Sequence, residues 1–283
     1  MMKLNGLLAG TLGAIATLSV GCTPNVTAPQ TQQEIKLTGA ATPYPAMKAL
    51  AAAYESEAEN VKITFLPPSQ SSSGIAGVKE GLVDLGTVTR KPKPDEDDGT
   101  LVYREVARDA LTVATHPDVE GVTDLKTEDL KAIYSGETRN WQQIGGPDAQ
   151  IVVLDRAEDE SAKRLLRKHY LGKDLKNASD AVILRHESEL IKAVTDTPYS
   201  IGAFSLAYAI SHQLTANRLS LDGVAPTLEN VQSGQYQMVR NLGIVSNPTP
   251  SETSQKFIDF IFSDAGAKTL KKAGFVPADP PQE

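Results

Sequence analysis

The segment Ile35-Lys36-Leu37-Thr38-Gly39-Ala40-Ala41-Thr42-Pro43-Tyr44-Pro45 is predicted to form a short strand, a small polar loop and the first residue of a helix. The helix is expected over residues 45–57, because apolar side chains recur there at helical spacing along one face. These side chains are Met47, Leu50, Ala51 and Tyr54. A strand followed by a loop and a helix is the unit from which α/β domains are built.

Strands and helices alternate along the rest of the chain. The further predicted strands are residues 61–66, 83–88, 110–115, 151–154 and 238–245. Further helices are predicted over residues 74–80, 161–171 and 188–195, and one or two helices over 252–272. Another predicted helix is capped by Thr127 and ended by Gly136. This order predicts α/β architecture with largely parallel sheets.

Three loops that follow predicted strands are small and polar. They span residues 39–45, 69–74 and 155–161. In open α/β sheets, ligands bind beyond the carboxyl ends of the strands, where helix N-termini present N–H groups to an anion. Hydroxyl groups donate to an oxyanion, and arginine binds one through two N–H groups. Each loop alone is also consistent with ordinary helix capping by Thr42, Ser73 or Ser161, but three in succession favour an anion site.

The N-terminal segment has the pattern of a signal peptide. Lys3 precedes an uncharged run over residues 4–20, and Gly21 and Cys22 follow it. The sequence Ser19-Val20-Gly21-Cys22 resembles a lipobox, in which the cysteine is lipidated, although Ser19 stands where leucine is usual. The alternative is an incidental cysteine in a plain signal peptide. We expect residues 1–21 to be a signal peptide and residues 22–34 to be a lipidated cysteine and flexible tether.

The composition argues against several classes of protein. The formal net charge is −7, whereas nucleic acid and anionic membranes select basic surfaces. Cys22 is the single cysteine, which excludes disulfides within the chain and cysteine-rich metal sites. The motifs HExxH, GxSxG and SxxK are absent from the sequence, and its 4 histidines fall in no ligand spacing. No cofactor, metal or enzymatic activity is therefore predicted.

Several motifs, in order along the chain, resemble the periplasmic phosphate-binding proteins of ABC transporters, which belong to the type II binding-protein superfamily. The motifs are residues 39–45, 71–75, 83–90, 130–141, 199–208 and 274–277. The resemblance implies the type II periplasmic-binding-protein fold, with two α/β lobes joined by a two-strand hinge. Lobe 1 would comprise residues 35–113 and 225–283, and lobe 2 residues 114–224. Closure about the hinge would bury the ligand.

The same resemblance implies a set of ligand-binding residues. They are Thr42, Pro43 and Tyr44 in the first loop, Ser71, Ser72 and Ser73 in the second, Thr89 and Arg90 after the next strand, and Arg156, Glu160 and Ser161 in the third. Within this set, Thr42 and Ser71 match anion-bonding positions, and Arg156 matches the anion-binding arginine. The alternative for Arg156 is a surface salt bridge to Glu158 or Asp159.

Three departures from the family pattern leave the identity of the anion open. Pro43 has no N–H group to donate. Glu160-Ser161-Ala162 replaces the usual Ser-Gly-Thr of the third loop. Thr89 stands where some members carry an acidic acceptor, which favours a protonated phosphate over fully ionised sulfate.

The expected function is that of an extracytoplasmic lipoprotein, on the outer face of the cytoplasmic membrane or in the periplasm. As a monomer, it would capture an oxyanion, with phosphate favoured, and deliver it to the permease of an ABC importer. Three alternatives remain: a binding protein for sulfate, molybdate or a phosphonate, a sensory anion-binding protein and, less favoured, a hydrolase.

Overall fold

The computed structural model describes residues 32–279. The predicted signal peptide, Cys22 and the tether as far as residue 31 lie outside the described residues. Strand β1 (Gln33–Gly39) begins two residues before the strand predicted from residue 35, inside the segment expected to be tether. Within the described part of the chain, no helix combines the length and the apolar character needed to span a bilayer.

One mixed sheet organises the described residues, with the strand order β2-β1-β3-β11-β4-β8-β6-β7. Its strands are β1, β2 (Val61–Phe65), β3 (Leu85–Val88), β4 (Val102–Thr115), β6 (Val152–Arg156), β7 (Val182–Leu184), β8 (Ser200–Ser205) and β11 (Val239–Ser246). Pairing is parallel among β1, β2 and β3 and again among β6, β7 and β8. The predicted α/β class is confirmed, but β4 and β11 pair antiparallel with their neighbours, so the sheet is not parallel throughout.

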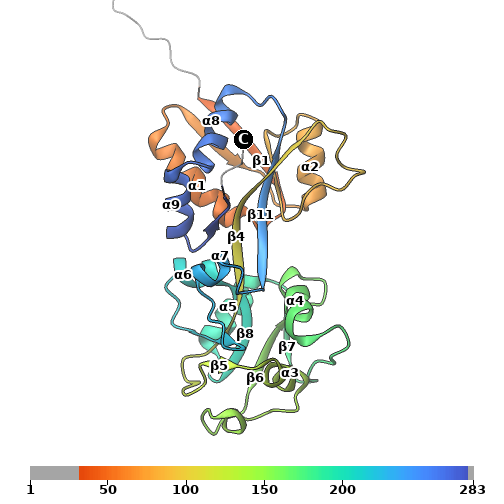
Figure 1. Ribbon diagram of the computed structural model, residues 1–283, viewed down its shortest axis with the longest axis vertical. Coiled ribbons are helices and arrows are strands. Elements are labelled where there is room, and N and C mark those ends of the chain that lie inside the picture. The colour runs from red at the N-terminus through yellow and green to blue at the C-terminus, as the bar shows by residue number, and fades with distance from the viewer. Residues whose placement is uncertain (1–31, 280–283) are drawn as a thin grey trace, which may run out of the picture. The chain divides into compact units, whose positions relative to one another are not determined.

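Strands β4 and β11 lie side by side and link the two parallel groups (Figure 1). The first part of β4 pairs with β11, and its last part, from Leu111 to Thr115, pairs with β8. The register between β4 and β11 shifts between Leu242 and Gly243. Because β11 supports β4 along this length, β4 begins at Val102, well before the predicted start at residue 110.

Helices cover the sheet. They are α1 (Tyr44–Glu57), α2 (Ser71–Lys79), α3 (Thr127–Ser135), α4 (Ser161–Leu166) with a following π turn (Arg167–Leu171), α5 (Glu187–Asp196), α6 (Leu206–Ser211), α7 (Leu228–Gln232), α8 (Glu252–Ile261) and α9 (Asp264–Lys272). The remaining short elements are β5 (Asp124–Leu125), β9 (Asn217–Arg218), β10 (Ser220–Leu221), β12 (Val276–Pro277) and a 3₁₀ turn (Trp141–Ile144).

The predicted helices are found, with changes at two N-termini. Helix α2 begins at Ser71, three residues before the predicted start, so the serines form its first turn. Helix α3 has Lys126 as its N-cap, so the predicted capping role of Thr127 is wrong. Thr127 instead donates its hydroxyl hydrogen to Asp222, at 2.7 Å. Gly136 ends α3 in the left-handed conformation, with φ 79°, as a glycine at this position favours.

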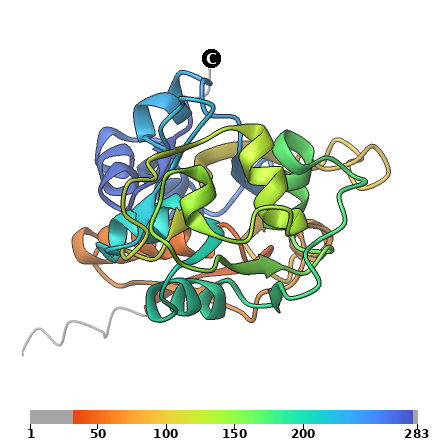
Figure 2. The same cartoon turned by 90° about the horizontal axis from the view of Figure 1, so that it is seen from below.

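Two large hydrophobic clusters hold these elements. In one cluster, α1 contributes Met47 and Leu50 to the apolar side chains of β1 and α8. In the other cluster, Tyr134 of α3 and Trp141 of the following 3₁₀ turn are fully buried. A smaller cluster packs Leu190 of α5 onto the strands β6 and β8. Figure 2 shows the helices arranged around the strands in a view from below. The lobe boundaries derived from the sequence stay a prediction.

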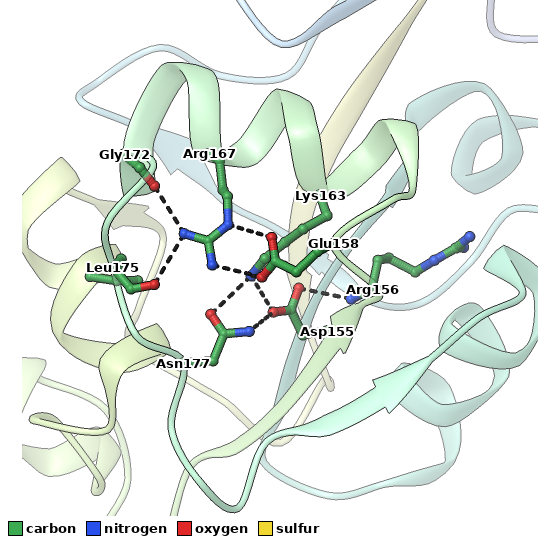
Figure 3. A network of polar contacts seen from close by, with 8 residues as sticks. All are labelled: Asp155, Arg156, Glu158, Lys163, Arg167, Gly172, Leu175 and Asn177. Carbon is green, nitrogen blue, oxygen red and sulfur yellow. Dashed lines mark hydrogen bonds and ion pairs between the residues drawn. The ribbon is translucent and has the colours of Figure 1, made fainter.

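A buried ionic network ties α4 to the end of β6 (Figure 3). The Lys163 side chain is 0% exposed, and its ammonium contacts the Asp155 carboxylate and, at 3.1 Å, Asn177 Oδ1. Asn177 Nδ2 donates to Asp155 at 2.9 Å, and the Arg156 backbone N–H donates to Asp155 at 2.8 Å. Every charge in the network has a partner, which is the condition under which a buried ion pair is tolerated.

We expect Asp155→Ala to lower the free energy of unfolding by about 3–5 kcal/mol, because it leaves the buried Lys163 ammonium without its closest counter-ion. Urea denaturation followed by circular dichroism measures the change. The matched control is Asp159→Ala, which removes an exposed carboxylate 3.6 Å from Arg185 and should cost at most about 1 kcal/mol. Equal unfolding midpoints for the two variants would contradict the structural role of Asp155.

Candidate functional site

Two neighbouring cavities bring together residues from the first and third polar loops. One has a volume of about 410 Å³, and its lining includes Thr42, Arg156, Glu160 and Ser161. The other has a volume of about 490 Å³, and its lining includes Thr42, Thr89 and Ser161. Thr42 and Ser161 line both cavities, so the side chains predicted from loops more than a hundred residues apart do meet.

Arg156 is the last residue of β6, at the carboxyl edge of that strand. It is 7% exposed, and its guanidinium lies on the other side of the strand from the Asp155 network (Figure 3). Its Nη2 donates to the Arg185 carbonyl at 2.6 Å and forms an ion pair with Glu160 at 3.0 Å. The predicted alternative of a salt bridge to Glu158 or Asp159 is wrong, because these two carboxylates pair with Arg167 and Arg185.

Two further nitrogens of this guanidinium lack an acceptor. Arg156 Nε and Nη1 are buried and form no hydrogen bond with any described residue. Buried polar groups in proteins are nearly always hydrogen-bonded, so such donors at a cavity wall mark a place for an acceptor. Each of these charged N–H groups can donate a hydrogen bond to an oxygen of an oxyanion.

The first loop lines the cavities with Ala41, Thr42 and Pro45, whereas Pro43 and Tyr44 lie elsewhere. Thr42 is half-buried and lines both cavities. Pro43 is the N-cap residue of α1 and is buried. Tyr44 donates its hydroxyl hydrogen to the Leu66 carbonyl at 2.8 Å and packs edge-on against Phe65, so its ring belongs to the core.

In the second loop, Ser71 is coupled to Thr89. The Ser71 hydroxyl oxygen accepts the Thr89 backbone N–H at 3.1 Å, which holds the start of α2 next to the end of β3. Ser72 and Ser73 are exposed in the first turn of α2, and neither lines the two cavities. The close approach of α2 to β3 needs glycine, because a Cβ on Gly86 would lie 2.5 Å from the Gly74 carbonyl oxygen.

Arg90 forms an ion pair away from the two cavities. Its guanidinium donates to both carboxylate oxygens of Glu96, at 2.6 and 2.7 Å, and to the Lys91 carbonyl at 3.1 Å. The hydrogen bonds from Arg90 lower the pKa of Glu96 to about 2. Arg90 lines neither cavity and instead fixes the acidic loop that follows β3.

A buried charge cluster at the 410 Å³ cavity was missed by sequence reasoning. Arg240 of β11 is the register partner of Asp109 of β4, and its Nη2 lies 2.5 Å from Asp109 and 3.3 Å from Glu187. Asp109 also accepts the Ser205 hydroxyl hydrogen at 3.0 Å. Burial raises the pKa of Asp109, against the attraction of Arg240. A charged residue inside the apolar strand predicted over 238–245 was the available signal for this cluster.

Metal chemistry finds no support within residues 32–279. No group of three or more His, Cys, Asp or Glu side chains in this range is placed to hold a metal ion. The polar side chains at the cavities include hydroxyls and cationic groups, which suit the binding of an anion through hydrogen bonds.

Comparisons with known proteins agree with this picture. Residues 24–265 match the family model of the PBP superfamily domain. The phosphate-binding protein PstS of Borreliella burgdorferi is 30% identical over 250 residues, which cover 86% of this chain and 89% of that protein. The phosphate-binding protein PstS of Bacillus subtilis is 28% identical over 210 residues, covering 73% of this chain and 68% of that protein.

A crystal structure shares the fold. It is a Clostridium perfringens protein with bound phosphate, assigned as the substrate-binding protein of a phosphate ABC transporter. It matches with a TM-score of 0.71 and 27% identity, over 87% of this chain and 100% of that chain. The predicted type II fold is thereby confirmed. The chain belongs to the PBP superfamily and, within it, to the substrate-binding proteins of phosphate ABC transporters, a family of transport proteins and not of enzymes.

Proposed function

We propose that this protein captures phosphate in the cleft lined by Thr42, Arg156 and Ser161 and delivers it to the permease of an ABC importer. The observation that carries the proposal is the Arg156 guanidinium, which is buried at a cavity wall with two nitrogens lacking an acceptor. The relatives that bind phosphate by name support this choice of anion.

We propose further that the cleft closes over the anion. Thr42 belongs to the predicted lobe 1, and Arg156 and Ser161 belong to the predicted lobe 2, yet these residues line one cavity. The two strands that link the lobes, β4 and β11, would act as the hinge, and the protein would work as a monomer. Exclusion of water would strengthen each charge-assisted hydrogen bond to the anion.

The position of Glu160 favours phosphate over fully ionised oxyanions as the ligand. Its carboxylate lies 3.0 Å from Arg156 Nη2 and would face any anion bound by this guanidinium. The Glu160 carboxylate repels a bound anion unless the anion carries a hydrogen that it donates to this carboxylate. Phosphate retains such a hydrogen at neutral pH in its monobasic and dibasic forms, whereas sulfate does not. Glu160 would therefore take the role of the acidic acceptor that Thr89 cannot fill.

The lipid anchor is proposed from the sequence alone. Lipidation at Cys22 would hold the protein at a membrane surface facing outward from the cytoplasm, with the polar segment after it as a tether. After processing, a lipoprotein cysteine carries more than one acyl chain, which is sufficient for stable anchoring.

Removal of the Arg156 guanidinium should weaken phosphate binding. We expect Arg156→Ala to lower the affinity roughly thirtyfold or more, because truncation of one partner of a buried charged contact costs about 2–5 kcal/mol. Arg156→Lys should also bind poorly, since an ammonium cannot replace the planar fork. Isothermal titration with phosphate measures both affinities.

The control for the Arg156 variants is Arg90→Ala, because Arg90 is engaged with Glu96 and lines neither cavity. Its affinity should stay within about twofold of wild type, because the half-buried Arg90–Glu96 pair lies outside both cavities. If Arg156→Ala and Arg90→Ala bind phosphate equally well, Arg156 is not part of the site.

Glu160→Gln should change the selectivity between anions. The substitution removes a carboxylate beside Arg156, so we expect the ratio of phosphate to sulfate affinity to fall, with sulfate gaining the most. Competition of sulfate against radiolabelled phosphate, in wild type and variant at one pH, gives the ratio. An unchanged ratio would exclude Glu160 as the acidic acceptor.

Cys22→Ala should release the protein from the membrane fraction, because the variant lacks the thiol that would carry the lipid. Immunoblotting of membrane and soluble fractions measures the distribution. Cys22→Ala protein that remains with the membrane fraction would show that another feature anchors it.

A further inference from the structure

Four arginine and lysine side chains line the two cavities: Arg156, Arg164, Lys168 and Arg240. Two of these have a carboxylate partner. Arg156 pairs with Glu160, and Arg240 pairs with Asp109. Within residues 32–279, no carboxylate forms a salt bridge with Arg164 or Lys168. These two charges therefore stand out as uncompensated.

Arg164 and Lys168 share one surface. They are four residues apart, one on α4 and the other on the π turn that continues it, and both are exposed. Both line the 490 Å³ cavity together with Thr42, Thr89 and Ser161. Arg164 Nη1 also donates to the Asp159 carbonyl, a contact that orders the side chain without neutralising its charge.

The two cavities differ in the charges of their walls. The 410 Å³ cavity has the carboxylates of Asp109, Glu160 and Glu187 beside Arg156 and Arg240. The described lining of the 490 Å³ cavity has Arg164, Lys168 and Arg240 and no carboxylate. Since the whole chain carries a formal net charge of −7, its long-range field repels anions, and an uncompensated basic wall is where an anion is attracted.

We propose that Arg164 and Lys168 form a cationic entrance, which attracts the oxyanion and concentrates it next to Thr42 and Ser161 before it reaches Arg156. The inference rests on the proposed function, because it describes how the anion reaches the binding site proposed there. Exposed charges at the rim of a site act mainly on the association rate and its salt dependence. The entrance therefore determines how fast the anion is captured, whereas Arg156 determines how long it is held.

The test uses the double variant Arg164→Gln/Lys168→Gln in the full chain, solubilised in detergent. Rapid filtration with radiolabelled inorganic phosphate gives the association and dissociation rate constants. At about 0.01 M ionic strength, where the Debye length is about 30 Å, we expect the association rate constant to fall at least about fivefold. At about 1 M, where the Debye length is about 3 Å, wild type and variant should agree within about twofold. The dissociation rate constant should be unchanged.

The matched control is Lys268→Gln/Lys272→Gln on α9, which removes two exposed lysines at the same spacing and changes the net charge equally. It should associate with phosphate like wild type. Equal association rate constants for the two double variants at low salt would overturn the proposal, as would a deficit that persists at high salt.

Two further outcomes distinguish the cationic entrance from a docking surface and from a failure of anion binding itself. Normal phosphate association by Arg164→Gln/Lys168→Gln, combined with reduced uptake by cells, would overturn the entrance and assign the two residues to docking on the transporter. If wild type binds none of phosphate, sulfate, molybdate or a phosphonate, the proposed function itself fails and the entrance with it. If wild type binds phosphate and the double variant behaves normally, only the entrance fails.

Discussion

The antiparallel pairing of β4 with β11 is the constraint on which the candidate site depends. These strands connect the two parallel groups of the sheet, and Asp109 and Arg240 meet across them as register partners. Because the pair is buried, each charge needs a partner, and Glu187, Ser205 and the Ala207 backbone N–H add further contacts. The strands that link the groups thus also form part of the wall of the 410 Å³ cavity.

Internal counter-ions explain how a cleft built for an anion is stable without one. Glu160 supplies a carboxylate to Arg156, and Asp109 supplies one to Arg240. Two buried nitrogens of Arg156, Nε and Nη1, have no acceptor among the described residues, whereas Arg240 has one such nitrogen, Nε. An incoming anion can therefore accept a hydrogen bond from one of these free N–H groups while Glu160 keeps its contact with Nη2, so that binding adds to the existing interactions of the guanidinium.

The sequence predicted the parts of the site that depend on local order along the chain. Thr42 lies in the loop after β1, Arg156 ends β6 and Ser161 begins the helix after β6, so all three lie at carboxyl ends of strands, in two different parallel groups. Residues from these two strand ends line one cavity. The tertiary surroundings decided the rest. Tyr44 turns into the core because the Leu66 carbonyl accepts its hydroxyl hydrogen, and Arg90 turns to Glu96. The Asp109–Arg240 pair joins residues 131 positions apart, a separation that no local pattern encodes.

The burial of Arg156 has a thermodynamic consequence for any ligand of this protein. An arginine free in solvent samples many rotamers, and fixing one costs up to about 2 kcal/mol of conformational entropy. Here the side chain is 7% exposed and already held by the Arg185 carbonyl and Glu160. Folding has restricted these rotamers before the anion arrives. The guanidinium is preorganised, and more of its interaction enthalpy is retained as binding free energy.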